Sequence, residues 1–188
     1  MKIKVVLLIL VLIMLSACSY TEKNDVKFKK QKNYQIKEIK DGSNIKYDYI
    51  IYDNDHNEVD KGTAYRIKPR INIIDCILQL CISEGTGLQN CKYYDTEEKN
   101  KSKWFETPIL YNKEFVVRLN ELTNPTGIIV EDIFNKLNFY KEYSVNFSNN
   151  EIWPVKNIKF IDDNVIELTY ISDNNSKSET KNIILNYD

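Results

Sequence analysis

The stretch Ile45-Lys-Tyr-Asp-Tyr-Ile-Ile51 places apolar or aromatic residues at positions 45, 47, 49 and 51. Such alternation is typical of a β-strand with one buried face. The run from Val165 to Tyr170 has the same pattern. From Tyr34 onward, similar runs are separated by clusters of Asn, Asp, Gly and Lys at spacings of about 8–12 residues. The sequence therefore predicts a single all-β domain over residues 34–188.

One segment of this domain also fits a helix. Val130, Ile133, Phe134 and Leu137 fall at positions i, i+3, i+4 and i+7, as on one face of an amphipathic helix. The β-branched run Ile128-Ile129-Val130 and the following Asn-Lys-Leu-Asn favour a hairpin instead. We expect a strand here.

A weak internal repeat supports the β-sheet interpretation. Strands run into an Asp at a polar turn at Asp53, Asp95, Asp132 and, more loosely, Asp173, with spacings of 42, 37 and 41 residues. In the second and third units a Lys follows four positions later, at Lys99 and Lys136. The alternative is a coincidence of turns in a chain rich in Asn and Asp.

A period near 40 residues is the scale of one propeller blade. The domain has room for about three to four such units, whereas a closed propeller normally needs at least four. We therefore expect consecutive antiparallel β-meanders in blade-like units. They form an open array, or alternatively a β-sandwich or barrel.

The composition sets limits on function. Hydrophobic residues make up 43% of the 188 residues and charged residues 28%, which excludes a mainly disordered or collagen-like chain. The net charge of −1 gives no strong field, so we expect no nucleic-acid partner.

The amino-terminal segment is unlike the rest. Lys2 and Lys4 precede the apolar run Val5–Leu15, which is too short to span a bilayer and fits a signal sequence. Leu15-Ser16-Ala17-Cys18 resembles the lipobox of bacterial lipoproteins. That resemblance implies a signal peptide over residues 1–17, cleavage before Cys18 and lipidation (diacylglyceryl, palmitate-type chains) of its thiol. The mature chain would then be anchored on the extracytoplasmic face of the cell membrane. The alternative is an ordinary secretory signal that contains a cysteine.

Residues 18–33 follow as a Lys-rich segment without apolar periodicity. We interpret it as a flexible tether. Its lysines either lie near anionic lipid at the membrane surface or are simply solvated.

The body resembles a family of small, uncharacterised lipoproteins from Gram-positive, mainly clostridial-type bacteria. The resemblance lies in five short motifs, listed here: Glu84-Gly-Thr-Gly87, Tyr93-Tyr-Asp95, Trp104-Phe-Glu-Thr-Pro108, Val130-Glu-Asp-Ile133 and Phe139-Tyr-Lys-Glu-Tyr143. It implies a blade-like β-meander and a location in the cell envelope, and it implies no activity.

Three cysteines remain after Cys18. In a hairpin centred on Thr86, Cys81 and Cys91 each lie five residues from the centre and face each other. A disulfide between them is within geometric reach, and it would persist outside the cell. Cys76 is then left as a small buried hydrophobe. The alternative is three buried free thiols.

Other candidate motifs are incomplete. Asp53, Asp55 and Asn57 match the first ligand positions of an EF-hand loop, but Glu58 replaces the glycine and Ala64 the last glutamate. The single histidine, His56, supports no catalytic triad. Gly85 and Gly87 fit a β-turn better than a phosphate-binding loop.

Paired carboxylates occur at Glu97-Glu98 and Asp162-Asp163, both in polar turns. We therefore assign no catalytic, cofactor-binding or metal-ligating residue and expect no cofactor. The 22 aromatic residues are mostly strand-packing residues, although some tyrosines could line a recognition surface.

The function expected from these features is that of an envelope lipoprotein that binds a protein, a peptide or a wall polymer. Two alternatives remain open, a small hydrolase that uses carboxylates and an accessory component of an envelope assembly.

Overall fold

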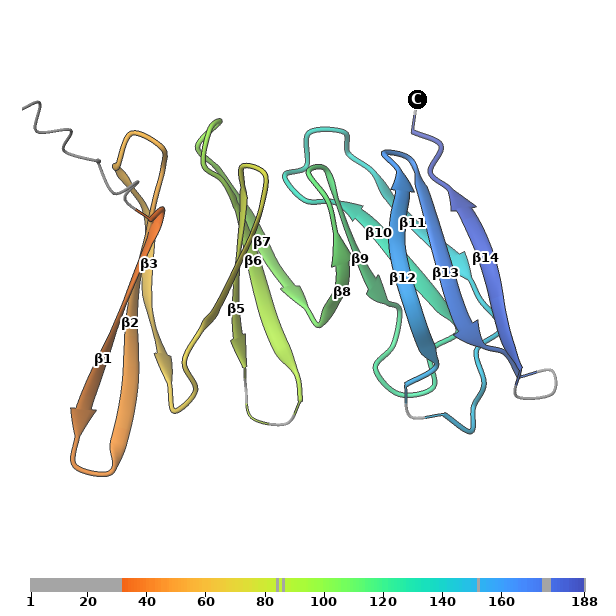
Figure 1. Cartoon of the computed structure of the whole chain (residues 1–188), viewed down its shortest axis with the longest axis horizontal. Coiled ribbons are helices and arrows are strands. Elements are labelled where there is room, and N and C mark those ends of the chain that lie inside the picture. Colours follow the sequence, from red (N-terminus) through yellow and green to blue (C-terminus); the bar gives the residue numbers. More distant parts are fainter. Residues whose placement is uncertain (1–31, 84, 86, 152, 174–176, 188) are drawn as a thin grey trace, which may run out of the picture. The chain divides into compact units, whose positions relative to one another are not determined.

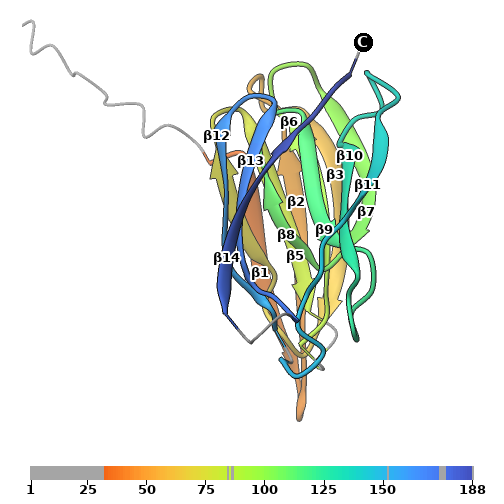
Figure 2. The ribbon, with the colours of Figure 1, turned by 90° about the vertical axis from the view of Figure 1, so that its right-hand side faces the viewer.

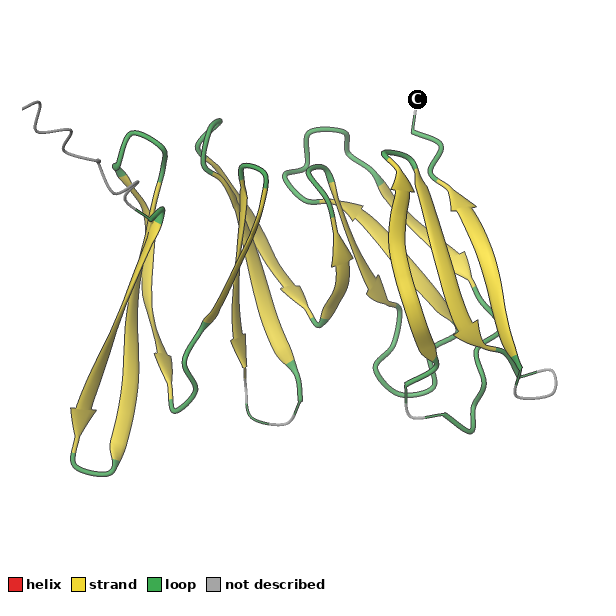
Figure 3. Ribbon diagram, in the orientation of Figure 1, coloured by secondary structure: helices red, strands yellow, loops and turns green. Residues whose placement is uncertain are grey.

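The computed structural model describes residues 32–188, apart from positions 84, 86, 152, 174–176 and 188. The predicted signal peptide 1–17, Cys18 and most of the predicted tether 18–33 lie outside the described residues. The described part consists of strands, turns and loops and contains no helix (Figure 3). In particular, it holds no apolar helix of membrane-spanning length. The prediction of an all-β fold is confirmed.

The strands form four antiparallel sheets in chain order (Figure 1). The first sheet contains β1 (Tyr34–Asp41), β2 (Asn44–Tyr52) and β3 (Glu58–Tyr65). The second contains β4 (Arg70–Ile74), β5 (Ile77–Ser83), β6 (Gln89–Asp95) and β7 (Asn100–Glu106). The third contains β8 (Pro108–Tyr111), β9 (Phe115–Leu119), β10 (Gly127–Asp132) and β11 (Tyr140–Ser144). The fourth contains β12 (Val155–Asp162), β13 (Val165–Ile171) and β14 (Ser178–Ile184).

Successive sheets pack face to face, and their strands run in roughly the same direction (Figure 2). Each adjacent pair of sheets encloses a hydrophobic core, represented by Tyr49 with Leu80, Tyr93 with Val116, and Val130 with Leu168. Among the residues described, no core joins the fourth sheet to the first. The units are therefore blade-like meanders in an open array, as the sequence predicts, rather than a closed barrel.

The burial patterns follow from this stacking. In β2 only every second residue is buried, at Tyr47, Tyr49 and Ile51, because the first sheet has a neighbour on one face only. All six residues of β10 are buried, because the third sheet has neighbours on both faces. This explains why Ile128-Ile129-Val130 is a continuous apolar run.

The preference for a strand over a helix near Val130 is confirmed. The strand β10 ends at Asp132, and residues after it form bends rather than a helix. Asn135 and Asn138 have φ values of 58° and 49°, in the left-handed region that a right-handed helix excludes.

The Asp repeat marks equivalent turns in the first three units. Asp53, Asp95 and Asp132 are buried, and each carboxylate accepts backbone N–H groups from the turn that follows it. In the fourth unit the equivalent buried residue is Ser172, whereas Asp173 is exposed. The fourth unit therefore lacks the buried carboxylate at this position.

The two lysines of the repeat connect successive units. Lys99 Nζ lies 2.8 Å from Asp55 Oδ2 and 3.4 Å from Asp53 Oδ2 in the preceding unit. Lys136 pairs in the same way with Glu98, and its Nζ lies 3.9 Å from Asp95 Oδ2. The repeat is thus also a series of ion pairs from one sheet to the next.

The outer faces of the first and fourth sheets carry charged and hydroxyl side chains. On the first sheet, Thr63 donates a hydrogen bond of 2.7 Å to Asp48, and Lys46 lies on the same face. On the fourth sheet, Lys159 pairs with Glu167 at 2.9 Å. Each end of the stack therefore turns charged and hydroxyl side chains outward.

Candidate functional site

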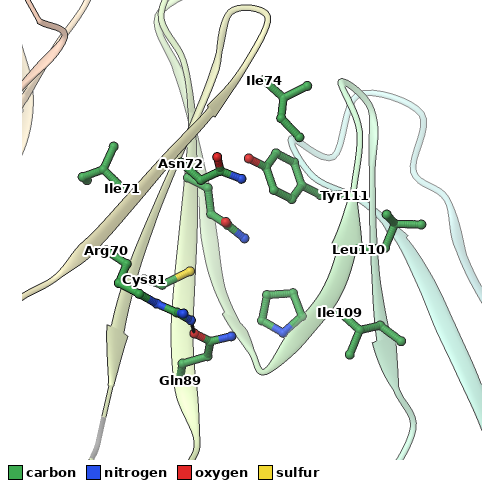
Figure 4. Close-up of a pocket in the computed structure, with 11 residues that line it drawn as sticks. Arg70, Ile71, Asn72, Ile74, Cys81, Gln89, Ile109, Leu110 and Tyr111 are labelled. Carbon is green, nitrogen blue, oxygen red and sulfur yellow. Dashed lines mark hydrogen bonds between the residues drawn. The ribbon is translucent and has the colours of Figure 1, made fainter. Parts of the chain in front are cut away.

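Three strands border a groove along one side of the described unit. The strands β4, β8 and β12 each pair with a neighbour on one side only, with β5, β9 and β13 respectively. A cavity of about 520 Å³ lies between β4 and β8 (Figure 4). It is lined by Arg70, Ile71, Asn72, Ile74, Gln79, Cys81, Gln89, Pro108, Ile109, Leu110 and Tyr111.

A second cavity, of about 450 Å³, lies between β8 and β12. It is lined in part by Trp153 and Lys156, and it shares three residues with the first cavity, namely Gln89, Pro108 and Ile109. We call the two cavities together the edge groove.

The strand β8 is irregular at the point where the two cavities meet. Its pairing with β9 shifts register between Pro108 and Leu110, so that Ile109 is the extra residue of a β-bulge. Pro108 is the first residue of β8, where its missing N–H costs no ladder bond. The bulge places Ile109 where it lines both cavities.

Tyr111 provides a buried polar group in the wall of the edge groove. The residue is only 8% exposed, and its ring packs against Tyr93 with centroids 5.0 Å apart. Its hydroxyl points toward Asn72 (Figure 4), but among the described residues none lies in hydrogen-bonding geometry with it. Burial raises the pKa of Tyr111 to about 12. The hydroxyl therefore stays protonated and available as a donor.

The charge of the edge groove is positive. Arg70 Nη2 donates a hydrogen bond to Oε1 of Gln89, and the described residues place no carboxylate within ion-pair distance of Arg70. Lys156 lies in the second cavity and pairs with Glu151 at 3.6 Å. No Asp or Glu is among the described residues that line either cavity.

The predicted cysteine pair lies at the base of this groove. The β5–β6 hairpin has the predicted register, with Cys81 directly opposite Cys91. The structure joins them by a disulfide with an S–S distance of 1.98 Å, and Cys81 lines the first cavity. Cys76 is a half-buried free thiol whose pKa is raised by burial and by the nearby Asp95. Cys18, the predicted lipidation site, lies outside the described residues.

The EF-hand-like segment forms a hydrogen-bonded turn. Asp53 Oδ1 accepts the backbone N–H groups of Asp55 at 2.9 Å and Asn57 at 2.8 Å. The Asn57 amide and the Lys99 ammonium hold the pKa of Asp53 below its usual range. No cluster of three or more His, Cys, Asp or Glu side chains suited to a metal occurs in the described part of the chain.

The remaining motifs belong to turns. Gly85 and Gly87 have φ values of 91° and 83°, which few other residues adopt. Glu98 pairs with Lys136 beside the buried Asp95. Asp162 and Asp163 are exposed at the β12–β13 turn.

Two acidic residues that hold cations between strands were not recognised from the sequence. Asp60 accepts hydrogen bonds from Lys92 Nζ at 2.7 Å and from the Tyr94 hydroxyl at 2.8 Å. Burial alone would raise the pKa of Asp60, but these two donors outweigh burial and lower it. No sequence signal distinguishes Asp60 from the surface acids around it.

Glu131 is the second of these acids, and unlike Asp60 it is buried. It accepts from Lys103 Nζ at 2.6 Å and from Arg118 Nε at 2.9 Å. These cations overcome the effect of burial and lower its pKa. Both Asp60 and Glu131 therefore remain ionised and hold neighbouring strands together.

The most exposed aromatic residues lie on different sheets. Tyr65, Trp104 and Tyr140 lie on β3, β7 and β11, one on each of the first three sheets. Trp153 differs, because it borders the edge groove. Most other aromatic side chains, among them Tyr93, Phe105 and Phe115, are core residues.

A larger cavity of about 790 Å³ lies near the β1–β2 turn and the start of the β5–β6 turn. It is lined by charges of both signs, including Asp41, Lys46 and Arg66. It has no buried polar atom without a partner among the described residues. The edge groove is therefore the stronger candidate for a binding site.

No family model, no curated protein and no solved structure matches this chain. Its function therefore has to be inferred from the residues of the edge groove and from the amino-terminal sequence.

Proposed function

We propose that the protein is a lipoprotein anchored through Cys18 on the extracytoplasmic face of the cell membrane, and that it acts as a binding module through the edge groove. The lipobox-like Leu15-Ser16-Ala17-Cys18 supports the anchor. The apolar run before it is too short to span the bilayer by itself.

The edge groove is the observation that carries the binding role. Its walls combine aliphatic side chains with converging polar groups, a combination that ligand sites use for contact and for orientation. Tyr111 presents a buried hydroxyl without a partner among the described residues. A ligand that accepts a hydrogen bond from this hydroxyl would remove a cost of about 1–3 kcal/mol.

A hydrolase that uses carboxylates has less support. No described carboxylate lines either cavity of the edge groove. Asp60 and Glu131 have lowered pKa values, whereas a general acid needs a raised one. Both side chains are also engaged by cations, which favours a structural role.

The anchor is tested by changing Cys18→Ala in cells supplied with radiolabelled palmitate. The unchanged protein should carry label and remain in the membrane fraction, and protease added to intact cells should degrade it. The variant should lose the label and leave the membrane. Membrane retention of an unlabelled variant would contradict lipid anchoring.

The binding role is tested by filling the edge groove. Asn72 is an exposed residue of β4 that lines the first cavity, so Asn72→Trp should block it. Asn182→Trp is the matched control on the exposed strand β14. The lipidated chain in detergent micelles should retain a component of solubilised envelopes. Only Asn72→Trp should lose it, and equal retention by both variants would exclude the groove.

A further inference from the structure

We propose that the edge groove binds an extended peptide that carries a carboxylate at its carboxyl end, and that this peptide adds a strand to the free edge of β4. This inference rests on the proposed binding function and names its ligand class. It follows from the geometry of β4, from the charge of the groove and from Tyr111.

Of the three strands along the groove, only β4 is suited to strand addition. It pairs with β5 without a register shift, from Arg70 opposite Cys81 to Ile74 opposite Ile77. The strand β8 is bulged at Ile109, and β12 has two register shifts. Because bulges twist an edge away from further pairing, β8 and β12 are protected edges and β4 is not.

The side chains of β4 do little to prevent another strand from pairing with its free edge. Ile73 is 48% exposed and Ile74 is 40% exposed, and Arg70 is the only charged residue of the strand. Soluble proteins normally guard such an edge with charges, proline or a covering segment. A regular edge that ends in two exposed isoleucines is therefore a surface that a partner strand fits, through main-chain hydrogen bonds.

Charge complementarity selects the end of the peptide. Arg70 begins β4, and the described lining of the groove holds no carboxylate. A peptide that pairs antiparallel to β4, as all the sheets of this protein do, places its carboxyl end beside Arg70. A terminal carboxylate or an acidic side chain at that end would form a charge-assisted bond with the guanidinium.

Tyr111 completes the site from the opposite wall. Its hydroxyl is buried, faces Asn72 of β4 and has no hydrogen-bond partner among the described residues (Figure 4). A peptide lying along β4 would bring a carbonyl oxygen into this space. The hydroxyl would then donate the hydrogen bond that it lacks.

Two other occupants fit less well. The predicted tether carries five lysines between positions 22 and 33, and these would meet Arg70 with like charge. A second copy paired antiparallel through β4 would place Arg70 opposite Ile74, which leaves the guanidinium without a carboxylate. The chemistry of the edge groove favours an acidic peptide from another protein.

The test uses the lipidated chain in detergent micelles and fluorescein-labelled peptides of about six residues, the length that covers β4. The parent peptide alternates valine and threonine and ends in glutamate with a free carboxyl end. A second peptide has an amidated carboxyl end. A third is amidated and has glutamine in place of glutamate, so it is fully neutral. A fourth has the parent sequence with N-methyl groups at alternate residues. Fluorescence anisotropy measures the affinities. The first three peptides separate the terminal carboxylate from the side-chain carboxylate.

We expect the parent peptide to bind and the N-methylated peptide not to bind, because N-methylation removes the strand hydrogen bonds. Arg70→Gln should weaken binding of the parent by about tenfold and leave the fully neutral peptide unaffected. Tyr111→Phe should weaken binding of the parent peptide and of the fully neutral peptide alike, by about fivefold. Arg66→Gln, an exposed arginine outside the edge groove, is the control and should change nothing.

Three results would overturn the proposal. One is equal binding of the N-methylated peptide, and another is a dimer of the chain, in sedimentation, that Ile73→Lys disrupts. The third is absence of peptide binding at about 1 mM while Asn72→Trp still abolishes envelope retention. In that last case the binding function stands and the ligand is not a strand. Absence of peptide binding together with equal envelope retention by Asn72→Trp and Asn182→Trp would reject the binding function as well.

Discussion

Lys92 on β6 reaches Asp60 on β3, with Nζ 2.7 Å from Oδ2, across the interface between the first two sheets. Only 15% of the lysine side chain and 17% of the aspartate side chain are exposed. The Tyr94 hydroxyl donates to the same carboxylate oxygen. This cluster is a largely buried polar contact between the first two sheets, which the more exposed pairs of Lys99 with Asp53 and Asp55 also join.

Removing the carboxylate should therefore be costly. Asp60→Ala leaves Lys92 and Tyr94 without their acceptor, and we expect a loss of about 3 kcal/mol in the free energy of unfolding. Urea denaturation followed by tryptophan fluorescence measures it. The exposed pair of Glu38 and Lys40 provides the control, because Glu38→Ala should leave the urea midpoint unchanged. Equal effects of the two substitutions would refute the assigned role of Asp60.

The free energy of unfolding should decrease at acidic pH. The pKa of Glu131 is lower in the folded protein than in the unfolded chain, so the unfolded chain binds more protons as the pH falls through the usual range of a carboxyl. The stabilisation is complete above about pH 5 and is lost progressively below about pH 4. The difference in urea midpoint between the unchanged protein and Glu131→Gln should thus be large at pH 6 and shrink at pH 3.

Glu121→Gln is the control for this pH series, since Glu121 is exposed. Its urea midpoint should follow that of the unchanged protein at every pH. A Glu131→Gln profile parallel to that of the unchanged protein would show that Glu131 does not contribute to the acid sensitivity.

The buried aspartates of the repeat should matter more than the exposed one. Asp95 Oδ1 accepts the backbone N–H groups of Glu97 and Glu98, both at 3.0 Å. Asp95→Ala leaves these donors unpaired at the turn and should cost about 1–3 kcal/mol. Asp173→Ala, at the exposed position of the fourth unit, should cost less than about 0.5 kcal/mol. Thermal unfolding of both variants checks the order, and the reverse order would contradict it.

The thiols should differ in reactivity. Mass spectrometry of the unreduced protein after alkylation should show Cys81 linked to Cys91 and a label only on Cys76 among these three cysteines. Labelling of Cys76 at neutral pH should be slow, because its pKa is raised. Reduction of the disulfide should lower the free energy of unfolding by about 3 kcal/mol. Alkylation of Cys81 and Cys91 without reduction would contradict the linkage in solution.

Local patterns in the sequence were enough to predict the sheets. Alternation at Tyr47, Tyr49 and Ile51 and the glycines at 85 and 87 define a strand and a turn from neighbours in the chain alone. The register that sets Cys81 opposite Cys91 follows from the turn. The regular spacing of Asp53, Asp95 and Asp132 revealed the units because the same turn recurs in each of them.

The edge groove could not be predicted in this way. It depends on β4 and β8 lying beside each other, although they belong to different sheets and no pattern within either strand records that proximity. The ion-pair partners of Lys99 could not be predicted for the same reason. The sequence showed a lysine four residues after Asp95, but its contacts are Asp53 and Asp55 of the preceding unit.

The charged side chains on the outer faces of the first and fourth sheets restrict how such an array can lengthen. A sheet added outside the first would bury Lys46 and Asp48, and one added outside the fourth would bury Lys159 and Glu167. A unit inserted between the second and third sheets would instead meet apolar side chains on both of its faces. Duplication of an internal unit is thus the tolerated route to a longer relative, and terminal growth is opposed by desolvation.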